Sequence, residues 1–194
     1  MNIIKDGTGS GNTAKVDDHG RLWVASSTVD HKQHHALYHK NLYIIDFDLT
    51  LSGATETPFA FFKNLDGTKD FEVYTVYISS NADVQVDWRL GDEYDSGGTI
   101  VQPCNSNRGS GLTISTAQAK IYEGGAAADL SLTTTNGVRF STAYIGANTQ
   151  QRIDFDGCLV LTNDTTASMT VTGATGNKVT MTVMLAYHTA GTKL

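Results

Sequence analysis

Two aspartates on the most strongly strand-forming run of the chain could do nucleophilic chemistry. The run Asn41–Gly53 contains the letters DFDLT from Asp46 to Thr50. A carboxylate at Asp46 could attack phosphorus, and Asp48 could act as acid and base beside a bound magnesium ion. The same run is also a good sheet strand, in which alternate residues face the core and the solvent. The two hypotheses predict different folds.

The first hypothesis is supported by a resemblance to the haloacid-dehalogenase-like phosphatases. Tyr77–Asn81 (YISSN) resembles the second motif of that family, and Gly91–Asp95 (GDEYD) resembles its metal-binding acids. The family places a lysine between these motifs, and Asn81–Leu90 contains none. Its parallel sheet also needs helices on both faces, and no convincing amphipathic helix follows Asp95. A magnesium phosphatase with Asp46 as nucleophile is therefore only an alternative.

Histidines and cysteines are the other candidate metal ligands. Four histidines have the spacing of one helical face and could bind zinc or nickel: His31, His34, His35 and His39. No carboxylate or cysteine stands at a matching offset, so we interpret Asp30–His39 as a solvated helical linker. Cys104 and Cys158 lack metal-ligand spacing, and we predict two free thiols, with a single disulfide as the alternative. The sequence predicts no cofactor.

Composition excludes several classes of partner. The 194 residues fit one domain of ordinary size, rich in Thr, Gly and Ser and with only two prolines, which favours strands and turns. A net charge of -6 and 14 scattered basic residues argue against a nucleic-acid-binding surface. No apolar run suits a signal segment or approaches the roughly 18 residues of a membrane span. We expect folding in a cytoplasm, without nucleic-acid or membrane partners.

From Asn41 onwards, short β runs separated by turn residues predict an antiparallel sandwich or barrel. Asp66-Gly67, between the runs Pro58–Leu65 and Phe71–Ser79, predicts a hairpin. Thr116–Ala128 is a short helical candidate. Further strand-like runs are Thr99–Gln102, Leu112–Thr116, Leu130–Thr134, Val138–Ile145, Arg152–Phe155, Cys158–Thr162 and Ser168–Thr172.

Alternation predicts which residues of the clearest strands are buried. In Lys178–His188 one face is apolar, and in Val84–Leu90 the residues Gln85, Asp87 and Arg89 are expected in water. In Asn41–Gly53 the predicted core residues are Tyr43, Ile45, Phe47, Leu49 and Leu51, which places Ile44, Asp46, Asp48 and Thr50 on the opposite face.

Residues 1–40 differ from the rest because they carry few core-sized side chains. Ordering about 20 such residues costs on the order of 20–40 kcal/mol, which needs on the order of 1,000 Å² of apolar burial to offset. We therefore predict an N-terminal arm and linker over residues 1–40 and a β-sandwich body over residues 41–194. The arm is either flexible or laid on another surface, that of its own body or that of a neighbour. The one strand-like piece of the arm is Arg21–Thr28.

The segment Ile4–Val24 resembles the N-termini of a group of tailed-bacteriophage virion proteins, which are rich in lysine, aspartate and glycine and continue with Ala-Lys-Val and an Arg-Leu strand. The matching residues are Lys5, Asp6, Gly7, Gly9, Gly11, Ala14, Lys15, Val16, Arg21 and Leu22. In the body, Phe59–Phe71 resembles the family's aromatic strand and acidic turn. Asn105–Gly111 resembles its Asn-x-Asn-Arg-Gly loop, and Met181–His188 its closing strand. The histidine-rich linker departs from the family.

This resemblance implies a non-enzymatic virion structural protein, of the head decoration or capsid cement type. It implies an antiparallel β-sandwich of jelly-roll type with an extended N-terminal arm. The implied partners are the major capsid protein and copies of the chain itself, as a homotrimer on the capsid exterior, made in the host cytoplasm. The expected interface residues are Asp6, Gly7, Gly9, Gly11, Lys15, Arg21, Trp23 and Arg108. A tail or baseplate protein with a receptor-facing surface is the runner-up.

Overall fold

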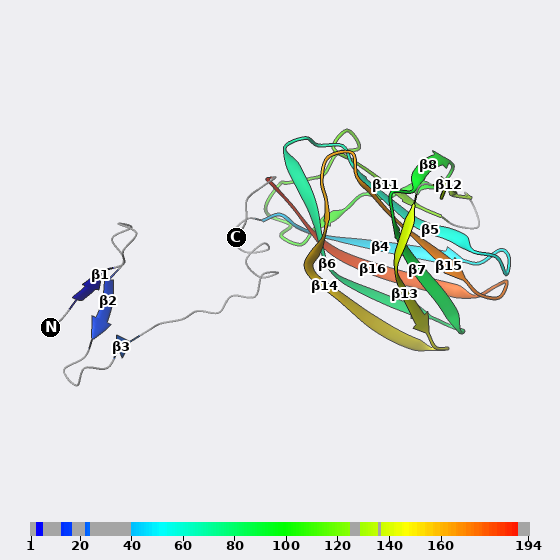
Figure 1. Ribbon diagram of the computed structural model, residues 1–194, viewed down its shortest axis with the longest axis horizontal. Helices are drawn as coiled ribbons and strands as arrows, with labels where there is room; N and C mark the ends of the chain where they lie inside the picture. Colours follow the sequence, from blue (N-terminus) through cyan, green and yellow to red (C-terminus); the bar gives the residue numbers. More distant parts are fainter. Residues whose placement is uncertain are drawn as a thin grey trace. The chain divides into compact units, whose positions relative to one another are not determined.

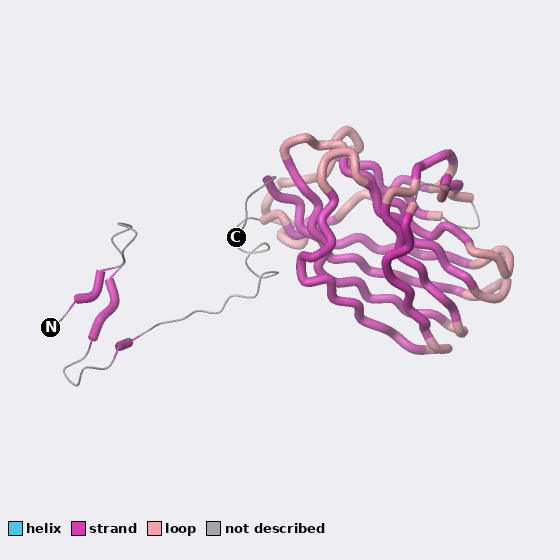
Figure 2. Tube along the Cα trace, in the orientation of Figure 1, coloured by secondary structure: helices cyan, strands magenta, loops and turns pink. Residues whose placement is uncertain are grey.

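The computed structural model describes residues 3–5, 13–16, 22–23, 40–124, 129–135 and 137–189. Within these residues every regular element is a strand, as Figure 2 shows, and the all-β prediction is confirmed. The chain divides into two compact units, Met1–His31 and Lys32–Leu194. The predicted boundary between residues 40 and 41 stays a prediction.

The N-terminal unit contains a small antiparallel sheet. Its strands are β1 (Ile3–Lys5), β2 (Thr13–Val16) and β3 (Leu22–Trp23), in the order β1-β2-β3. Sequence reasoning expected only one strand-like piece here. It missed β1 and β2 because two or three strand-formers among glycines fall below the length at which a run can be recognised.

The body is built from two larger antiparallel sheets and one two-stranded ribbon, seen in Figure 1. The β4 sheet has the order β10-β4-β16-β6-β14, the β5 sheet has the order β13-β7-β15-β5-β11-β9, and the ribbon pairs β12 with β8. The strands are β4 (Leu42–Thr50), β5 (Thr57–Asn64), β6 (Lys69–Ser80), β7 (Val84–Leu90), β8 (Glu93–Ser96), β9 (Thr99–Ile100), β10 (Cys104–Asn105), β11 (Ala119–Glu123), β12 (Ser131–Thr133), β13 (Val138–Ile145), β14 (Thr149–Leu161), β15 (Thr166–Thr172) and β16 (Lys178–Thr189).

The two larger sheets enclose one hydrophobic core. Phe47 of the β4 sheet meets Phe59 and Phe62 of the β5 sheet edge to face, with ring centroids 6.2 and 5.4 Å apart. The predicted register of β4 is confirmed, since its core-facing residues Tyr43, Ile45, Phe47, Leu49 and Leu51 are all buried. The alternate residues Asp46, Asp48 and Thr50 are exposed. The apolar face of β16 is buried as well: Val179, Met181, Val183, Leu185 and Tyr187.

The hairpin prediction at Asp66-Gly67 is wrong, although both flanking strands are present. β5 lies in the β5 sheet and β6 in the β4 sheet, so the turn crosses from one sheet to the other. Asp66 Oδ1 accepts hydrogen bonds from the backbone N–H and the hydroxyl of Thr68, at 2.8 and 2.7 Å. The turn residues therefore predicted that the chain bends here. Which sheet the next strand joins depends on pairing partners that are distant in the sequence.

Three further expectations need correction. Thr116–Ala128 is not a helix where it is described, because Ala119–Glu123 forms β11 against β5. Leu112–Thr116 is irregular, although its Ile114 is buried. The two runs around Gly157 belong to one strand, β14, whose pairing with β6 is interrupted by a bulge between Asp154 and Leu159.

Asp46→Asn is expected to change the free energy of unfolding by less than about 1 kcal/mol. The carboxylate is exposed and its Oδ1 accepts one hydrogen bond, from the Thr182 hydroxyl at 2.6 Å, which an amide oxygen can also accept. Urea denaturation of both proteins measures the difference. A loss of several kcal/mol would show that Asp46 has a structural role beyond this contact.

Candidate functional site

The predicted interface residues of the N-terminal segment are only partly described. Lys15 lies in β2, where its backbone pairs with Ile3 of β1 on one side and with Trp23 of β3 on the other. The structure therefore brings Lys15 and Trp23 together along the small sheet. The remaining predicted residues of this segment lie outside the described residues: Asp6, Gly7, Gly9, Gly11, Arg21 and the histidines between His31 and His39.

Arg108 is exposed at the tip of a loop with internal hydrogen bonds. The loop is Asn105–Gly111, as the sequence predicted. Asn107 N–H donates to Asn105 Oδ1 at 2.8 Å, and Ser110 N–H donates to the Asn107 carbonyl at 2.9 Å. An asparagine side chain that accepts a hydrogen bond from the backbone two residues on, together with a backbone turn, fixes a loop without help from a sheet. The Arg108 side chain is thus presented to solvent from an ordered loop.

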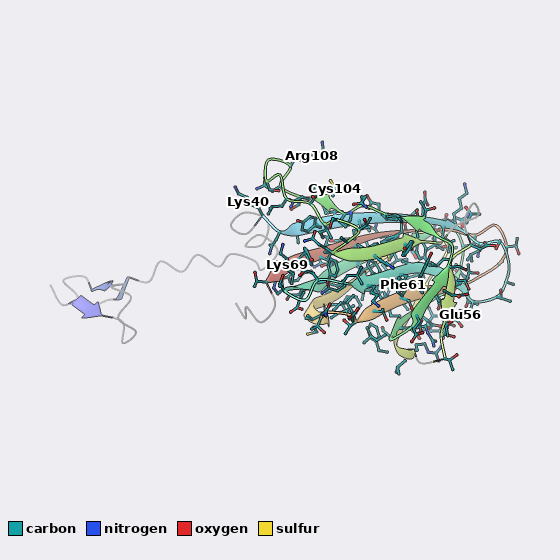
Figure 3. The ribbon with its side chains drawn as sticks, turned by 90° about the horizontal axis from the view of Figure 1, so that it is seen from above. Lys40, Glu56, Phe61, Lys69, Cys104 and Arg108 are labelled. Carbon is teal, nitrogen blue, oxygen red and sulfur yellow. The ribbon has the colours of Figure 1, made fainter. Side chains whose placement is uncertain are left out.

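The same loop is attached to the start of the body. Asn105 Nδ2 donates to the Lys40 carbonyl at 2.8 Å, and Ser106 N–H donates to the Leu42 carbonyl at 2.9 Å. Figure 3 shows Lys40, Cys104 and Arg108 at one end of the body, with Glu56 at the other. We call this the Lys40 end. It carries both Arg108 and the point where the N-terminal residues join the sandwich.

Hydrogen bonds to Asp66 connect the turn after β5 with Gln118 and with the last strand, β16. Tyr187 hydroxyl donates to Asp66 Oδ2 at 2.7 Å, and Gln118 Nε2 donates to the same oxygen at 3.4 Å. The hydrogen bonds from Thr68 and Tyr187 hold the pKa of Asp66 well below its usual range. Burial and the neighbouring Asp66 raise the pKa of Tyr187. Asp66 and Tyr187 therefore form a stable hydrogen bond at neutral pH and do not act as an acid–base pair.

The phosphatase hypothesis loses its structural basis. Asp46 and Asp48 lie on the outer face of β4, whose ladders with β10 and β16 are both antiparallel. The acids of the third motif begin with Asp92, which follows β7 of the other sheet. The three partial motifs therefore do not meet at the carboxyl ends of parallel strands, as that family requires.

The part of the chain that the structure describes contains no group of three acids, histidines or cysteines that could hold a metal ion. Cys104 and Cys158 are both free and exposed, as predicted.

Glu123 accepts a hydrogen bond from the Asp48 N–H, and its pKa is raised by burial and by the charge of Asp48. This carboxylate covers a backbone donor on the outer edge of β4, which protects that edge from further pairing.

A buried ion pair on the outer face of the β5 sheet was missed from the sequence. Arg89 Nε lies 3.0 Å from Asp92 Oδ2 and 3.3 Å from Oδ1, and Ser168 Oγ donates to Asp92 Oδ2 at 2.5 Å. The side chains of Arg89 and Asp92 are 16% and 0% exposed. A Cβ at Gly137 would lie 1.5 Å from Asp92 Oδ1, so only glycine leaves room for this carboxylate.

The prediction that Asp87 is in water is also wrong. Asp87 is buried, where it accepts hydrogen bonds from Thr142 at 2.5 Å, Gln85 at 2.8 Å and Arg139 at 3.2 Å. Burial alone would raise the pKa of Asp87, but these three hydrogen bonds outweigh it and lower the pKa. The outer face of the β5 sheet is thus a second, polar layer of packing.

Next to this polar layer lies a surface groove of about 630 Å³. Its lining includes the aromatic residues Phe61 and Tyr94 and the charged residues Lys63, Lys120 and Asp164. Tyr94 belongs to β8, one strand of the ribbon, and Phe61 belongs to β5. The groove is therefore formed where the ribbon meets the β5 sheet.

Comparison with known proteins gave no match to a family model, a curated protein or a solved structure. In the described residues there is no helix with the length and apolarity needed to cross a membrane. Fold and surface geometry therefore carry the functional argument, together with the resemblance of the motifs described above.

Proposed function

We propose that this protein is a non-enzymatic virion component, a decoration or cement protein bound to the outside of a phage capsid. The observation that carries the proposal is the position of the Asn105–Gly111 loop. This loop and the N-terminal segment are the two places where the resemblance predicts contacts. Two hydrogen bonds hold the loop on Lys40 and Leu42, where the N-terminal residues enter the body.

We also propose that the body is a jelly roll. In support, the first, second, third and fourth of its eight long strands pair with the eighth, seventh, sixth and fifth. These pairs are β4 with β16, β5 with β15, β6 with β14, and β7 with β13. A long antiparallel hairpin folded over into two sheets has this nested pairing, and it occurs in viral capsid domains.

Copies of the chain are proposed to contact one another as a homotrimer. β13 and β14 are the outermost strands of their sheets, and each has one neighbour only within the described strands. Exposed apolar side chains follow both edges, with exposures of 67% for Val138, 40% for Phe140, 76% for Tyr144 and 42% for Val160. Long open edges with apolar side chains are surfaces that proteins normally cover.

On a shell, such a protein would act by burying surface across junctions between capsid subunits and so opposing their separation. The acidic balance, with a net charge of -6, suits an outer surface rather than one that faces packaged DNA. The major capsid protein and further copies of this chain are the proposed partners. The N-terminal segment is the proposed arm, with Trp23 as an aromatic anchor.

Co-sedimentation tests this proposal. Purified phage shells assembled without this chain are mixed with the 194-residue protein, pelleted, and heated in parallel with shells alone. We expect saturable binding and a rise of several degrees in the temperature at which the shells break. Binding without saturation, or no change in shell stability, would count against a cement function.

A further inference from the structure

The groove between the ribbon and the β5 sheet has the volume and the lining of a ligand site. The shell-binding proposal does not use it. Its volume of about 630 Å³ lies within the range of small-molecule sites, which is roughly 300–1,000 Å³. It is lined by aromatic, charged, hydroxyl and aliphatic side chains from β5, β7, β8, β11, β14 and the start of β15.

One wall is a fixed aromatic platform. Tyr94 stacks on Tyr122 with ring centroids 4.4 Å apart and an interplanar angle of 12°. The ring centroid of Phe61 lies 5.9 Å from that of Tyr94 and 6.4 Å from that of Tyr122. Phe61 is fully buried although it is on the outer face of its sheet. The Tyr94 hydroxyl donates to the Gly97 carbonyl at 2.9 Å, which holds the ring in one orientation.

Tyr94 is in contact with the groove, whereas Tyr122 is not among its lining residues. Tyr122 supports the Tyr94 ring on one face. A ring held on one side by a second aromatic ring loses little side-chain entropy when a ligand stacks on its open side.

The charged side chains of the lining balance one another once Arg89 is counted. Lys63 Nζ lies 3.4 Å from Asp164 Oδ1, with the two side chains 33% and 68% exposed. Lys120 and Glu93 are exposed on the same rim and add one charge of each sign. The charge of Asp92, deeper in the lining, is balanced by Arg89.

This balance of charge selects the class of ligand. A groove with no net charge gives no electrostatic preference to a phosphate or a nucleic-acid backbone, which need an excess of positive charge. The ammonium groups and carboxylates do supply strong hydrogen-bond donors and acceptors side by side. The ligand that fits is neutral, carries several hydroxyl groups, and has one apolar face.

We propose that this groove binds a neutral oligosaccharide. The C–H face of one pyranose ring stacks on Tyr94, and its hydroxyl groups bond to Lys63, Lys120 and Asp164. This inference goes beyond the proposed capsid function and does not depend on it, because none of the residues proposed to bind the sugar is a predicted interface residue. Val160, which also lines the groove, belongs to the proposed β14 edge.

Saturation-transfer NMR with the whole chain tests the proposal. The probes are maltotriose, cellotriose, mannotriose and triacetylchitotriose, with sialyllactose and glucose 6-phosphate as anionic comparisons. We expect saturation of ring C–H protons in at least one neutral trisaccharide and none in glucose 6-phosphate. No transfer to any neutral trisaccharide at millimolar concentration, or preferential transfer to sialyllactose, would overturn it.

Variants then locate the site. Tyr94→Leu keeps Phe61 covered and should weaken binding about tenfold or more, the loss expected for one aromatic contact and its geometry. Lys120→Met, at an exposed position, should weaken binding several-fold without affecting folding. Lys178→Met, a matched change of an exposed lysine on β16 outside the groove, should leave affinity unchanged. Equal affinity in all three variants would place the sugar elsewhere and refute the assignment.

Discussion

Arg89→Met is expected to lower the free energy of unfolding by about 3–5 kcal/mol, because it leaves a buried carboxylate without its partner. Asp92 is fully buried, and Arg89 reaches both of its oxygens. The guanidinium also donates to the carbonyls of Thr134 and Gly137, at 3.3 and 3.2 Å. The substitution therefore also removes the tie between β7 and the segment before β13.

Urea denaturation followed by tryptophan fluorescence measures this loss. The double variant Arg89→Met, Asp92→Asn should be more stable than Arg89→Met alone, since it removes the unpaired charge as well. Arg152→Met is the matched control. Its side chain is 54% exposed beside Asp154, and an exposed pair contributes about 1 kcal/mol or less. Equal effects of Arg89→Met and Arg152→Met would contradict the buried-pair account.

Deleting residues 2–24 is expected to abolish most shell binding while the body stays folded. Among the residues whose burial the structure describes, the main core cluster runs from Tyr43 in β4 to Tyr187 in β16, and we expect this cluster to fold without residues 2–24. What the deletion removes is the sheet of β1, β2 and β3 and the predicted contact residues of the arm. Binding energy that depends on an extended segment disappears with that segment.

Circular dichroism and co-sedimentation of the shortened chain measure the two parts of this prediction separately. We expect an unchanged β spectrum and at least about a tenfold loss of affinity for shells, which corresponds to roughly 1.4 kcal/mol. Arg108→Ser in the full chain should weaken binding less, because the rest of its loop remains anchored on Lys40 and Leu42. Undiminished binding by the shortened chain would disprove the arm hypothesis.

Local pattern was enough to predict part of the fold. The core-facing residues of β4 and β16 followed from strict alternation, and the bounds of β7 and β13 match the predicted runs Val84–Leu90 and Val138–Ile145. Alternation works in these strands because one face packs on a core of fixed position. It gives no information on which sheet a strand joins, as the turn at Asp66-Gly67 demonstrates.

The buried outer face of the β5 sheet could not be predicted by alternation. That rule assumes water beyond the second face, whereas Asp87 and Asp92 are covered there by groups distant in sequence, such as Thr142 and Ser168. One local signal was present in Phe59–Phe62, where both faces of the strand are apolar. A continuous apolar run of this kind indicates a strand that is covered on both sides.

The candidate contact residues were predicted from motif resemblance, which gives no information on where they lie in the fold. The structure added the hydrogen bonds that attach the Arg108 loop to Lys40, which link residues 65 positions apart in the sequence. The aromatic groove was not anticipated at all. Its Tyr94 and the supporting Tyr122 lie in separate short strands, and only the packing of the ribbon against the β5 sheet brings the two rings together.

Cryo-electron microscopy of virions purified from cells that produce this chain tests the central claim most directly. The capsid-decoration account predicts density for a two-sheet β domain on the outside of the head. Three copies should meet at the β13 and β14 edges, and an arm should run from the Lys40 end onto the shell. Density for the domain in the tail or baseplate, or particles that lack the chain altogether, would contradict the account.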